Sequence, residues 1–359
     1  SLPPHRRTLP DARTVPPAPG PSVTMLCHRS HTSVILGRAA PDRQTSHPMA
    51  PTDPAPSRST AASTPGRTVA RWLPAAMWAS LPLVAGPVFA EALRHRSATV
   101  VLVAQVGLWV AWAGGLLAAL VASTVSLTAM RIIFPASLVA AVWAAALIAN
   151  HAGTAASFAL GMTSFAAVAS MSATVGFVFI NGSSYGDERR FPLRPSAPVL
   201  FGPIEVLWLA MVACTFAGPL LLATKQWILG TVLTILAVAL DIAGARAMHQ
   251  LSKRWLVFVP AGVVLVDRTV LLDAMLALRQ RVASMGLARD DSTAQDLGAG
   301  AIGIQVELRL TEPDAIVPTP ARRDRHQLVE TVDVDAVRFT PTRPGWVLDE
   351  ARVRRLTVE

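Results

Sequence analysis

The chain has 359 residues, of which 52% are hydrophobic and only 15% are charged, and its formal net charge is +9. Ordinary soluble domains contain about 25% charged residues, so this composition argues against a soluble globular protein. The positive charge comes mostly from the N-terminal tail and from the connections between apolar segments, which excludes the clustered basic face of a nucleic-acid-binding protein.

Residues 1–71 form a tail rich in Pro, Arg and Ser. They contain thirteen of the 28 prolines, nine arginines and three aspartates, without helix or strand periodicity. Such a composition predicts disorder, because the segment cannot bury enough apolar surface to offset its ordering entropy. The tail lacks the apolar core of a secretory signal. Met25 and Met49 are alternative starts, in which case part of residues 1–48 is an upstream extension.

Six apolar segments follow in residues 72–250, each close to the roughly 20 residues that a helix needs to cross a bilayer. A helix satisfies its own backbone groups inside lipid, so each segment predicts a transmembrane helix. We expect Arg131 in the connection before the third span. The preceding STVSLTAMR (123–131) either extends the second span or lies between two spans, and five spans are the alternative if 132–180 divides differently. The predicted spans are 73–93, 98–122, 132–150, 154–180, 203–223 and 226–246.

The run KRWLVFVPAGVVLVDR (253–268) is either a seventh span or a strand hairpin. Its twelve uncharged residues would reach about 18 Å as a helix, too short for a bilayer. Pro260 and Gly262 interrupt the run, and its two halves are β-branched and aromatic, as strands prefer. A short apolar run divided by turn residues predicts a hairpin. We therefore expect six spans, with the C-terminal region on the same side as the N-terminus.

Positive charge predicts the orientation of these six spans. With both termini inside, the inner loops and flanks contain nine Arg or Lys residues and the outer loops contain three. The positive-inside rule therefore predicts a multi-pass protein of the bacterial inner membrane with both termini in the cytoplasm. Arginine outnumbers lysine thirty to two, which indicates GC-rich coding and hence a high-GC bacterium.

Residues 251–359 are enough for one small domain. The alternating GIQVELRL (303–310) predicts a strand, and LVETVDVDAVRF (328–339) predicts one or two more, with EPDAIVPTPARRDRH between them as a loop. Residues 269–288 are helical or mixed by propensity. Pro344 is placed to open a last helix.

The segments RWLVFVPAGVVLVD and VRFTPTRPGWVLDEARVRR resemble the bacterial pleckstrin-homology-like (PH-like) domain. Over residues 72–359 the chain resembles uncharacterised multi-span membrane proteins of actinobacteria that end in such a domain. The resemblance implies an α-helical transmembrane bundle followed by a small, mostly β cytoplasmic domain, which would be a platform for protein or lipid contacts without catalytic residues. Residues 273–288 depart from the family pattern, which has strands there.

NGSSYGDERRFPLRPSAP (181–198) is the most distinctive polar stretch. Its three arginines, beside a membrane, would suit a lipid phosphate or a carboxylate, and the alternative is a solvated loop whose arginines only set the topology. Two more basic residues lie on one face of the last span and its extension. The candidates for contact with anionic lipid headgroups are Arg189, Arg190, Arg194, Arg246 and Lys253.

Polar side chains within the spans form a second set. A charged group at the bilayer centre costs a few kcal/mol, so the acids near the spans are candidates for function, and interfacial ion pairs are the alternative. The fourth span is rich in small residues and has a stripe of hydroxyls, which indicates either a tightly packed helix or a solute path. The candidates for a transport path are Asp241, Thr163, Ser170 and Thr174.

No motif of a conventional enzyme or metal site is present in the sequence. The two cysteines make no metal set, and GAGAIG (298–303) matches GxGxxG without the strand and helix that the motif requires. We therefore expect no enzyme activity, cofactor or metal. The sequence favours an interaction or regulatory protein of the inner membrane, in contact with the bilayer, anionic headgroups and a protein partner of the cytoplasmic domain. The alternative is a transporter of a small solute or ion, with a path among spans two, four and six.

Overall fold

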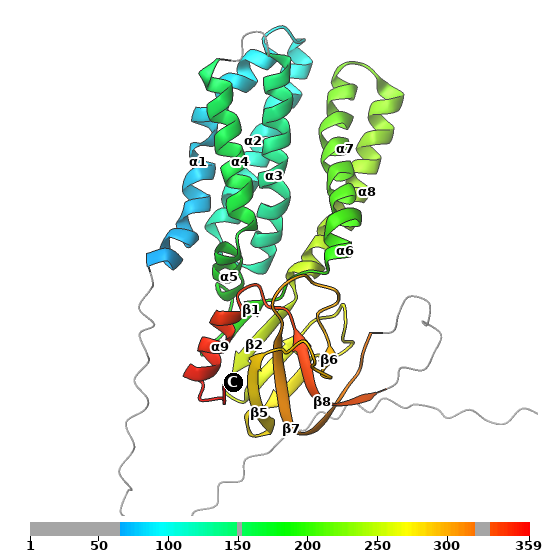
Figure 1. Ribbon diagram of the computed structural model, residues 1–359. Coiled ribbons are helices and arrows are strands. Elements are labelled where there is room, and N and C mark those ends of the chain that lie inside the picture. The colour runs from blue at the N-terminus through cyan, green and yellow to red at the C-terminus, as the bar shows by residue number, and fades with distance from the viewer. Residues whose placement is uncertain (1–64, 149–152, 320–330) are drawn as a thin grey trace, which may run out of the picture. The chain divides into compact units, whose positions relative to one another are not determined.

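The computed structural model describes residues 65–148, 153–319 and 331–359 (Figure 1). The helices are α1 (Pro65–Leu93), α2 (Ala98–Leu120), α3 (Thr124–Leu147), α4 (Thr154–Met171), α5 (Ala173–Asn181), α6 (Ala197–Val199), α7 (Glu205–Ala223), α8 (Trp227–Ser252) and α9 (Pro344–Val353). The strands are β1 (Arg189–Pro192), β2 (Trp255–Val259), β3 (Gly262–Val266), β4 (Met275–Leu278), β5 (Val282–Leu287), β6 (Gln295–Asp296), β7 (Val306–Ile316) and β8 (Val332–Phe339).

Six helices are long and apolar enough to cross a membrane, namely α1, α2, α3, α4, the joined segment Ala197–Ala223, and α8. The prediction of six such segments is confirmed, and the five-segment alternative is wrong because residues 132–180 contain parts of two separate long helices, α3 and α4. Their outer faces leave large apolar side chains exposed, such as Leu102 and Val110 of α2. Helices that are apolar on all sides are typical of membrane spans.

The third span begins eight residues before its predicted start. Ser123 caps α3, because its hydroxyl accepts a hydrogen bond from the Ser126 backbone N–H at 3.1 Å. Segment 123–131 is therefore the capped first part of α3, not an extension of α2 or a separate stretch. Arg131 lies within α3, and its predicted position in a connection is wrong. The Ser-Thr pair at 123–124 is an N-cap signal that hydropathy alone overlooks.

Two arginines cap the C-terminal ends of helices at the end of the bundle nearest the sheets. The predicted fourth span is divided at Ser172 into α4 and α5, and Arg131 Nε donates to the Ser170 carbonyl at the end of α4, at 3.5 Å. Arg71 Nη1 donates in the same way to the Ala119 carbonyl at the end of α2, at 3.0 Å. The last carbonyls of a helix lack intrahelical partners, so basic side chains there satisfy them and complement the helix dipole.

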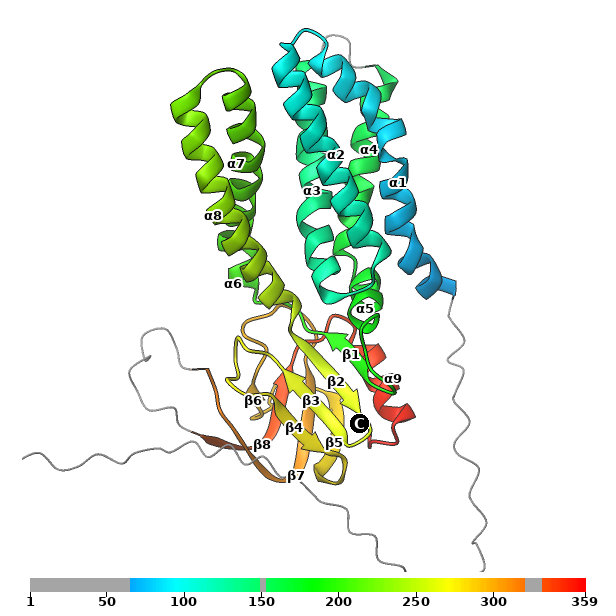
Figure 2. The same cartoon turned by 180° about the vertical axis from the view of Figure 1, so that it is seen from behind.

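The hairpin predicted at 253–268 is present as β2 and β3, which pair antiparallel from Trp255 and Val266 to Val259 and Gly262. It is not a seventh span. One four-stranded sheet has the order β1–β2–β3–β4 and the other has the order β5–β7–β8–β6, as the reverse view shows (Figure 2). Strand β1 comes from the connection between α5 and α6, so this domain also uses residues before 251.

Three predictions for the C-terminal domain have different outcomes. Residues 269–288, helical or mixed by propensity, contain strands β4 and β5, because pairing with β3 and β7 prevails. Residues 312–316, predicted as a loop, continue β7. Helix α9 begins at Pro344, as predicted.

Two segments with predictions lie outside the described residues. They are the tail residues 1–64 and residues 320–330, which include part of the predicted loop and strand. Residues 65–71, predicted as tail, belong to α1.

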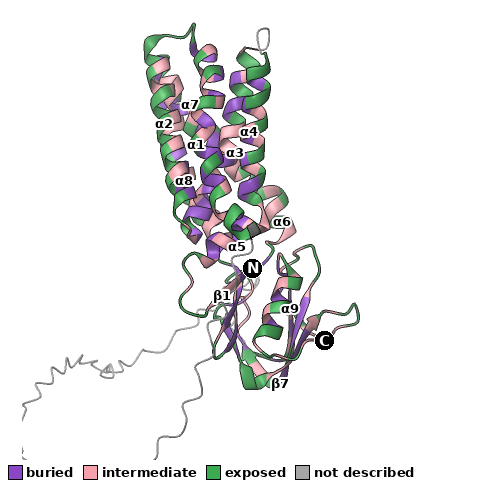
Figure 3. Ribbon diagram, turned by 90° about the vertical axis from the view of Figure 1, so that its left-hand side faces the viewer, coloured by how far each residue is buried: buried purple, intermediate pink, exposed green. Residues whose placement is uncertain are grey.

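Two hydrophobic cores meet at α5. One core lies among the helices, and the other lies between the two sheets and α9. Phe177 of α5 belongs to the second core and packs against Phe191 of β1 and Trp346 of α9, with ring centroids 5.4 and 5.2 Å apart. Figure 3 shows buried residues along the inner sides of helices and strands alike.

Candidate functional site

A cavity of about 180 Å³ lies among α1 to α4 and the hairpin formed by α7 and α8. Most of its lining comes from the middle of these helices. Most of the lining is aliphatic or aromatic, and the polar side chains are few. The lining includes Trp78, Trp112, Ser137, Thr163, Thr215 and Asp241.

Asp241 lies near the middle of α8. The sequence placed it toward the inner end of the last span, but α8 continues to Ser252. At 1.5 Å per residue, Asp241 is about 21 Å from the start of the helix and about 17 Å from its end. The Thr215 hydroxyl donates to its carboxylate, with both oxygens at 3.1 Å. In the described part of the chain, none of the ion pairs includes Asp241.

The α7–α8 hairpin brings Thr215 to Asp241. The two helices touch at Gly218, where a Cβ would lie 2.6 Å from Thr234 Oγ1. Small residues at such contacts permit this close approach of helices. Pro219 has no N–H, so the Thr215 carbonyl lacks its usual donor four residues on. Thr215 therefore adds two polar groups to α7, the helix beside Asp241. One is its hydroxyl, and the other is a backbone carbonyl without its usual helical donor.

Two tryptophans of the cavity lining, Trp78 and Trp112, are hydrogen-bonded to each other's backbone. Trp78 Nε1 donates to the Trp112 carbonyl at 2.7 Å, and Trp112 Nε1 donates to the Trp78 carbonyl at 3.0 Å. The second bond replaces one that Pro82 cannot donate, because proline lacks an N–H. Trp78 also stacks on Phe134 of α3, with ring centroids 4.1 Å apart. These contacts join α1, α2 and α3 at mid-length.

The structure brings two of the four predicted path residues together. Thr163 and Asp241 both line the cavity, and the Thr163 hydroxyl donates to the Ala159 carbonyl of its own helix at 2.8 Å. Ser170 is buried outside the cavity lining, and Thr174 belongs to α5, beyond the break at Ser172. The predicted stripe is therefore divided between two helices.

Sequence reasoning missed Thr215 and Ser137. A signal for Thr215 exists, because an antiparallel hairpin that turns near Lys225 places the middle of α7 beside the middle of α8. Ser137 donates to the Phe134 carbonyl at 2.7 Å and has no sequence signal of its own.

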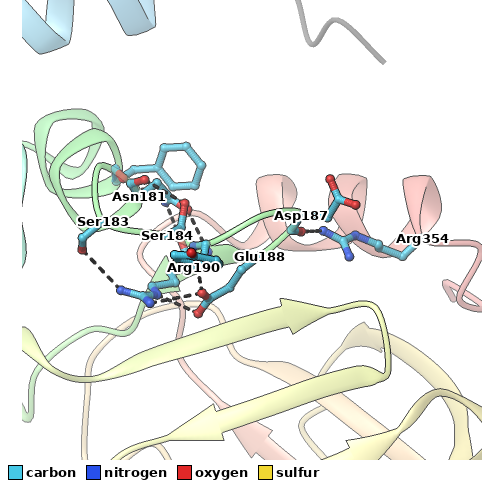
Figure 4. A network of polar contacts seen from close by, with 9 residues as sticks. Asn181, Ser183, Ser184, Asp187, Glu188, Arg190 and Arg354 are labelled. Carbon is cyan, nitrogen blue, oxygen red and sulfur yellow. Dashed lines mark hydrogen bonds and ion pairs between the residues drawn. The ribbon is translucent and has the colours of Figure 1, made fainter. Parts of the chain in front are cut away.

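The polar loop at 181–198 contains a hydrogen-bonded joint between α5 and β1 (Figure 4). The Asn181 amide donates to the carbonyls of Phe177 and Arg190, at 2.9 and 2.7 Å, and its oxygen accepts from the Arg190 N–H at 2.9 Å. The Arg190 guanidinium makes two bonds to Glu188, at 2.8 and 3.1 Å, and lies over the Trp255 ring. The Arg190 side chain is therefore held by contacts within the protein, with Glu188 and Trp255.

The predicted headgroup residues do not form one cluster. Arg194 donates from Nη1 to the Ile302 carbonyl at 3.0 Å, so it too makes an internal contact. Arg189 begins β1, Arg246 is exposed on α8, and Lys253 follows the end of α8. None of these three forms an ion pair with the residues that the structure describes. Headgroup contact stays a prediction for these residues.

The Glu188 contact predicts a pH-dependent contribution to stability. The Arg190 guanidinium, aided by the Tyr185 N–H, lowers the pKa of Glu188 from its ordinary value of 4.5. A lowered pKa stabilises the folded state above the ordinary value, and the effect disappears as pH falls through the folded-state pKa. Glu188→Gln should therefore lower the unfolding temperature at pH 7 and have less effect well below pH 4.5.

Thermal unfolding in detergent at several pH values measures this difference. Asp291→Asn is a suitable control, because Asp291 belongs to a pair in which both side chains are more than three-quarters exposed. A Glu188→Gln effect that stays constant down to acid pH would contradict the assignment.

Among the described residues, no group of three or more His, Cys, Asp or Glu side chains could hold a metal ion. Comparison with protein-family models, curated proteins and solved structures finds no match to the chain.

Proposed function

We propose that the protein conducts protons across the bacterial inner membrane through the mid-length cavity, and that Asp241 takes up and releases the proton. One observation carries the proposal: a carboxylate in the middle of an apolar helix of spanning length faces a cavity and accepts a bond from Thr215. An ionisable side chain at such depth is costly, so it marks a functional site by default.

The size and chemistry of the cavity favour a proton over a larger solute. Its volume of about 180 Å³ is below the 300–1,000 Å³ of pockets for drug-sized ligands, but it has room for several water molecules. A metal cation such as Ca²⁺ needs six to eight oxygen ligands. Asp241 and Thr215 offer too few, whereas a proton needs one carboxylate.

All six spans line the cavity, and the three among which a path is expected, spans two, four and six, each contribute to it. Trp112 comes from the second span, Thr163 from the fourth and Asp241 from the sixth. The apolar remainder of the lining limits water, which suits a path that conducts only when hydrated. These features favour the transport hypothesis over a solid, purely structural bundle.

Proton flux into liposomes tests the proposal. The purified protein is reconstituted with an internal pH-sensitive dye, and a potassium diffusion potential is applied. The wild type should acidify or alkalinise the lumen according to the sign of the potential, and Asp241→Asn should reduce the flux to that of protein-free liposomes. Glu91→Gln is the matched control, because Glu91 pairs with Arg94 at the end of α1, outside the cavity. Equal flux in wild type and Asp241→Asn, or none in the wild type, would refute the proposal.

A second proposal concerns the C-terminal domain, which we infer to be a PH-like, cytoplasmic interaction platform of an actinobacterial protein. Its support is two four-stranded sheets followed by a helix, together with the sequence resemblance and the charge distribution, from which the positive-inside rule predicts cytoplasmic termini. Photo-crosslinking in native membranes from Val353, which is 71% exposed on α9, tests it. A recurrent protein or anionic-lipid product supports the proposal, and no specific product contradicts it.

A further inference from the structure

The loop 298–304 exposes two large apolar side chains. Ile302 and Ile304 leave 69% and 60% of their surfaces exposed. The loop contains the GAGAIG stretch, which lies between strands β6 and β7 and not between a strand and a helix as the GxGxxG motif requires. These two side chains belong neither to the lining of the cavity nor to the hydrophobic core between the sheets.

The loop has a fixed conformation. Asp296 Oδ1 accepts the Gly298 N–H at 2.8 Å, and the Ala301 N–H donates to the Gly298 carbonyl at 3.0 Å. Gly300 has a φ of +72°, which favours glycine. Arg194 lies against the end of the loop, and its Nη1 holds the Ile302 carbonyl at 3.0 Å. The two isoleucines are therefore exposed on a loop whose backbone is held by hydrogen bonds.

The same loop is attached to the beginning of a span. The Ala197 N–H donates to the Gly300 carbonyl at 3.4 Å, and Ala197 is the first residue of the apolar segment Ala197–Ala223. Phe201, four residues on, is 70% exposed. The loop thus lies at the level where the chain enters the apolar zone, and Phe201 adds a third exposed apolar group at that level.

We propose that Ile302 and Ile304 insert into the interface of the inner leaflet and, with Phe201, anchor the sheet domain to the lipid. The Arg194 guanidinium, which is exposed at the same loop, then lies at the level of the lipid phosphates, where arginine is a favourable partner. Lipid is the occupant that the position favours, because the loop is hydrogen-bonded to the first residue of a span. The anchor would restrain the sheet domain against the bundle end where α5, α6 and α8 leave the membrane.

Depth-dependent quenching tests the anchor. Cys27 and Cys214 are replaced by serine and alanine, and Ile302→Cys or Ile304→Cys carries a small fluorophore in full-length protein. The protein is reconstituted in liposomes of phosphatidylethanolamine and phosphatidylglycerol. Leu278→Cys is the control, because Leu278 is 37% exposed and pairs with Gly262 at the end of the β2–β3 hairpin remote from α8.

The probes at 302 and 304 should be quenched by lipids with a nitroxide near the headgroup and protected from aqueous iodide. The probe at 278 should show the reverse. Iodide quenching at both 302 and 304 equal to that at 278 would overturn the anchor and leave a protein partner as the occupant of this patch. The result does not depend on Asp241, so it is independent of the proton proposal.

Discussion

Replacing Asp267 by alanine is expected to lower the free energy of unfolding by about 3–5 kcal/mol, because it leaves a buried arginine without its counter-charge. Arg254 and Asp267 are each 2% exposed, and they lie at the open end of the β2–β3 hairpin. Arg254 Nε and Nη2 lie 2.7 and 2.6 Å from Asp267 Oδ2, and Nη1 donates to the Arg194 carbonyl at 2.9 Å. Asp267 Oδ1 accepts from the Thr269 N–H and hydroxyl, at 3.0 and 2.6 Å. Every strong polar group of the pair is thus satisfied.

Denaturant unfolding in mixed micelles measures the loss, with intrinsic tryptophan fluorescence as the signal. Asp291→Ala should change stability by no more than a few tenths of a kcal/mol, because exposed pairs contribute little. The double variant Arg254→Met with Asp267→Leu should recover much of the loss, since apolar replacement of both partners is often neutral. An Asp267→Ala effect as small as that of Asp291→Ala would mean that water reaches Arg254.

Replacing Trp78 by alanine is expected to cost about 3–5 kcal/mol, as for other large core aromatics. Trp78 is 1% exposed, stacks on Phe134 and exchanges two indole–carbonyl bonds with Trp112. The variant also opens the wall of the cavity, so a rise in proton leak should accompany the loss of stability. Trp227→Ala is the matched control, because Trp227 is 65% exposed at the start of α8 and lies outside the cavity lining.

A subtler pair of variants tests the role of Pro82 in this contact. Trp112→Phe removes the donor to the Trp78 carbonyl and should cost about 1–3 kcal/mol, the penalty of an unsatisfied buried acceptor. Adding Pro82→Ala restores a backbone N–H four residues after Trp78 and should return part of that loss. No recovery in the double variant would show that the carbonyl finds another partner. Unfolding in the same micelles measures both.

Much of the fold follows from local sequence rules. The hairpin at 253–268 was predictable because its apolar run is too short for a bilayer and is divided by Pro260 and Gly262. Helix α9 was predictable from Pro344. Strand β5 was not predictable from propensity, because residues such as Met285 favour a helix until pairing with β7 decides. Arg131 was misplaced because hydropathy counts it as a loop residue, whereas in the fold it caps α4.

The candidate site was predictable only in part. Asp241 and Thr163 stand out as polar residues in apolar segments. Thr215 becomes a candidate only when the register of the α7–α8 hairpin, which places it beside Asp241, is known. That register depends on the contact at Gly218. The exchange between Trp78 and Trp112 depends on which helices are neighbours, and no sequence period encodes that.

The depth of Asp241 and the level of the 298–304 loop both depend on one claim, that α7 and α8 cross the bilayer and leave the sheet domain on the cytoplasmic side. Paired reporter fusions test this most directly, with alkaline phosphatase or green fluorescent protein fused after Lys225, between α7 and α8, and after Glu359. We predict phosphatase activity only after Lys225 and fluorescence only after Glu359. The same reporter active at both positions, or the reverse assignment, would contradict it.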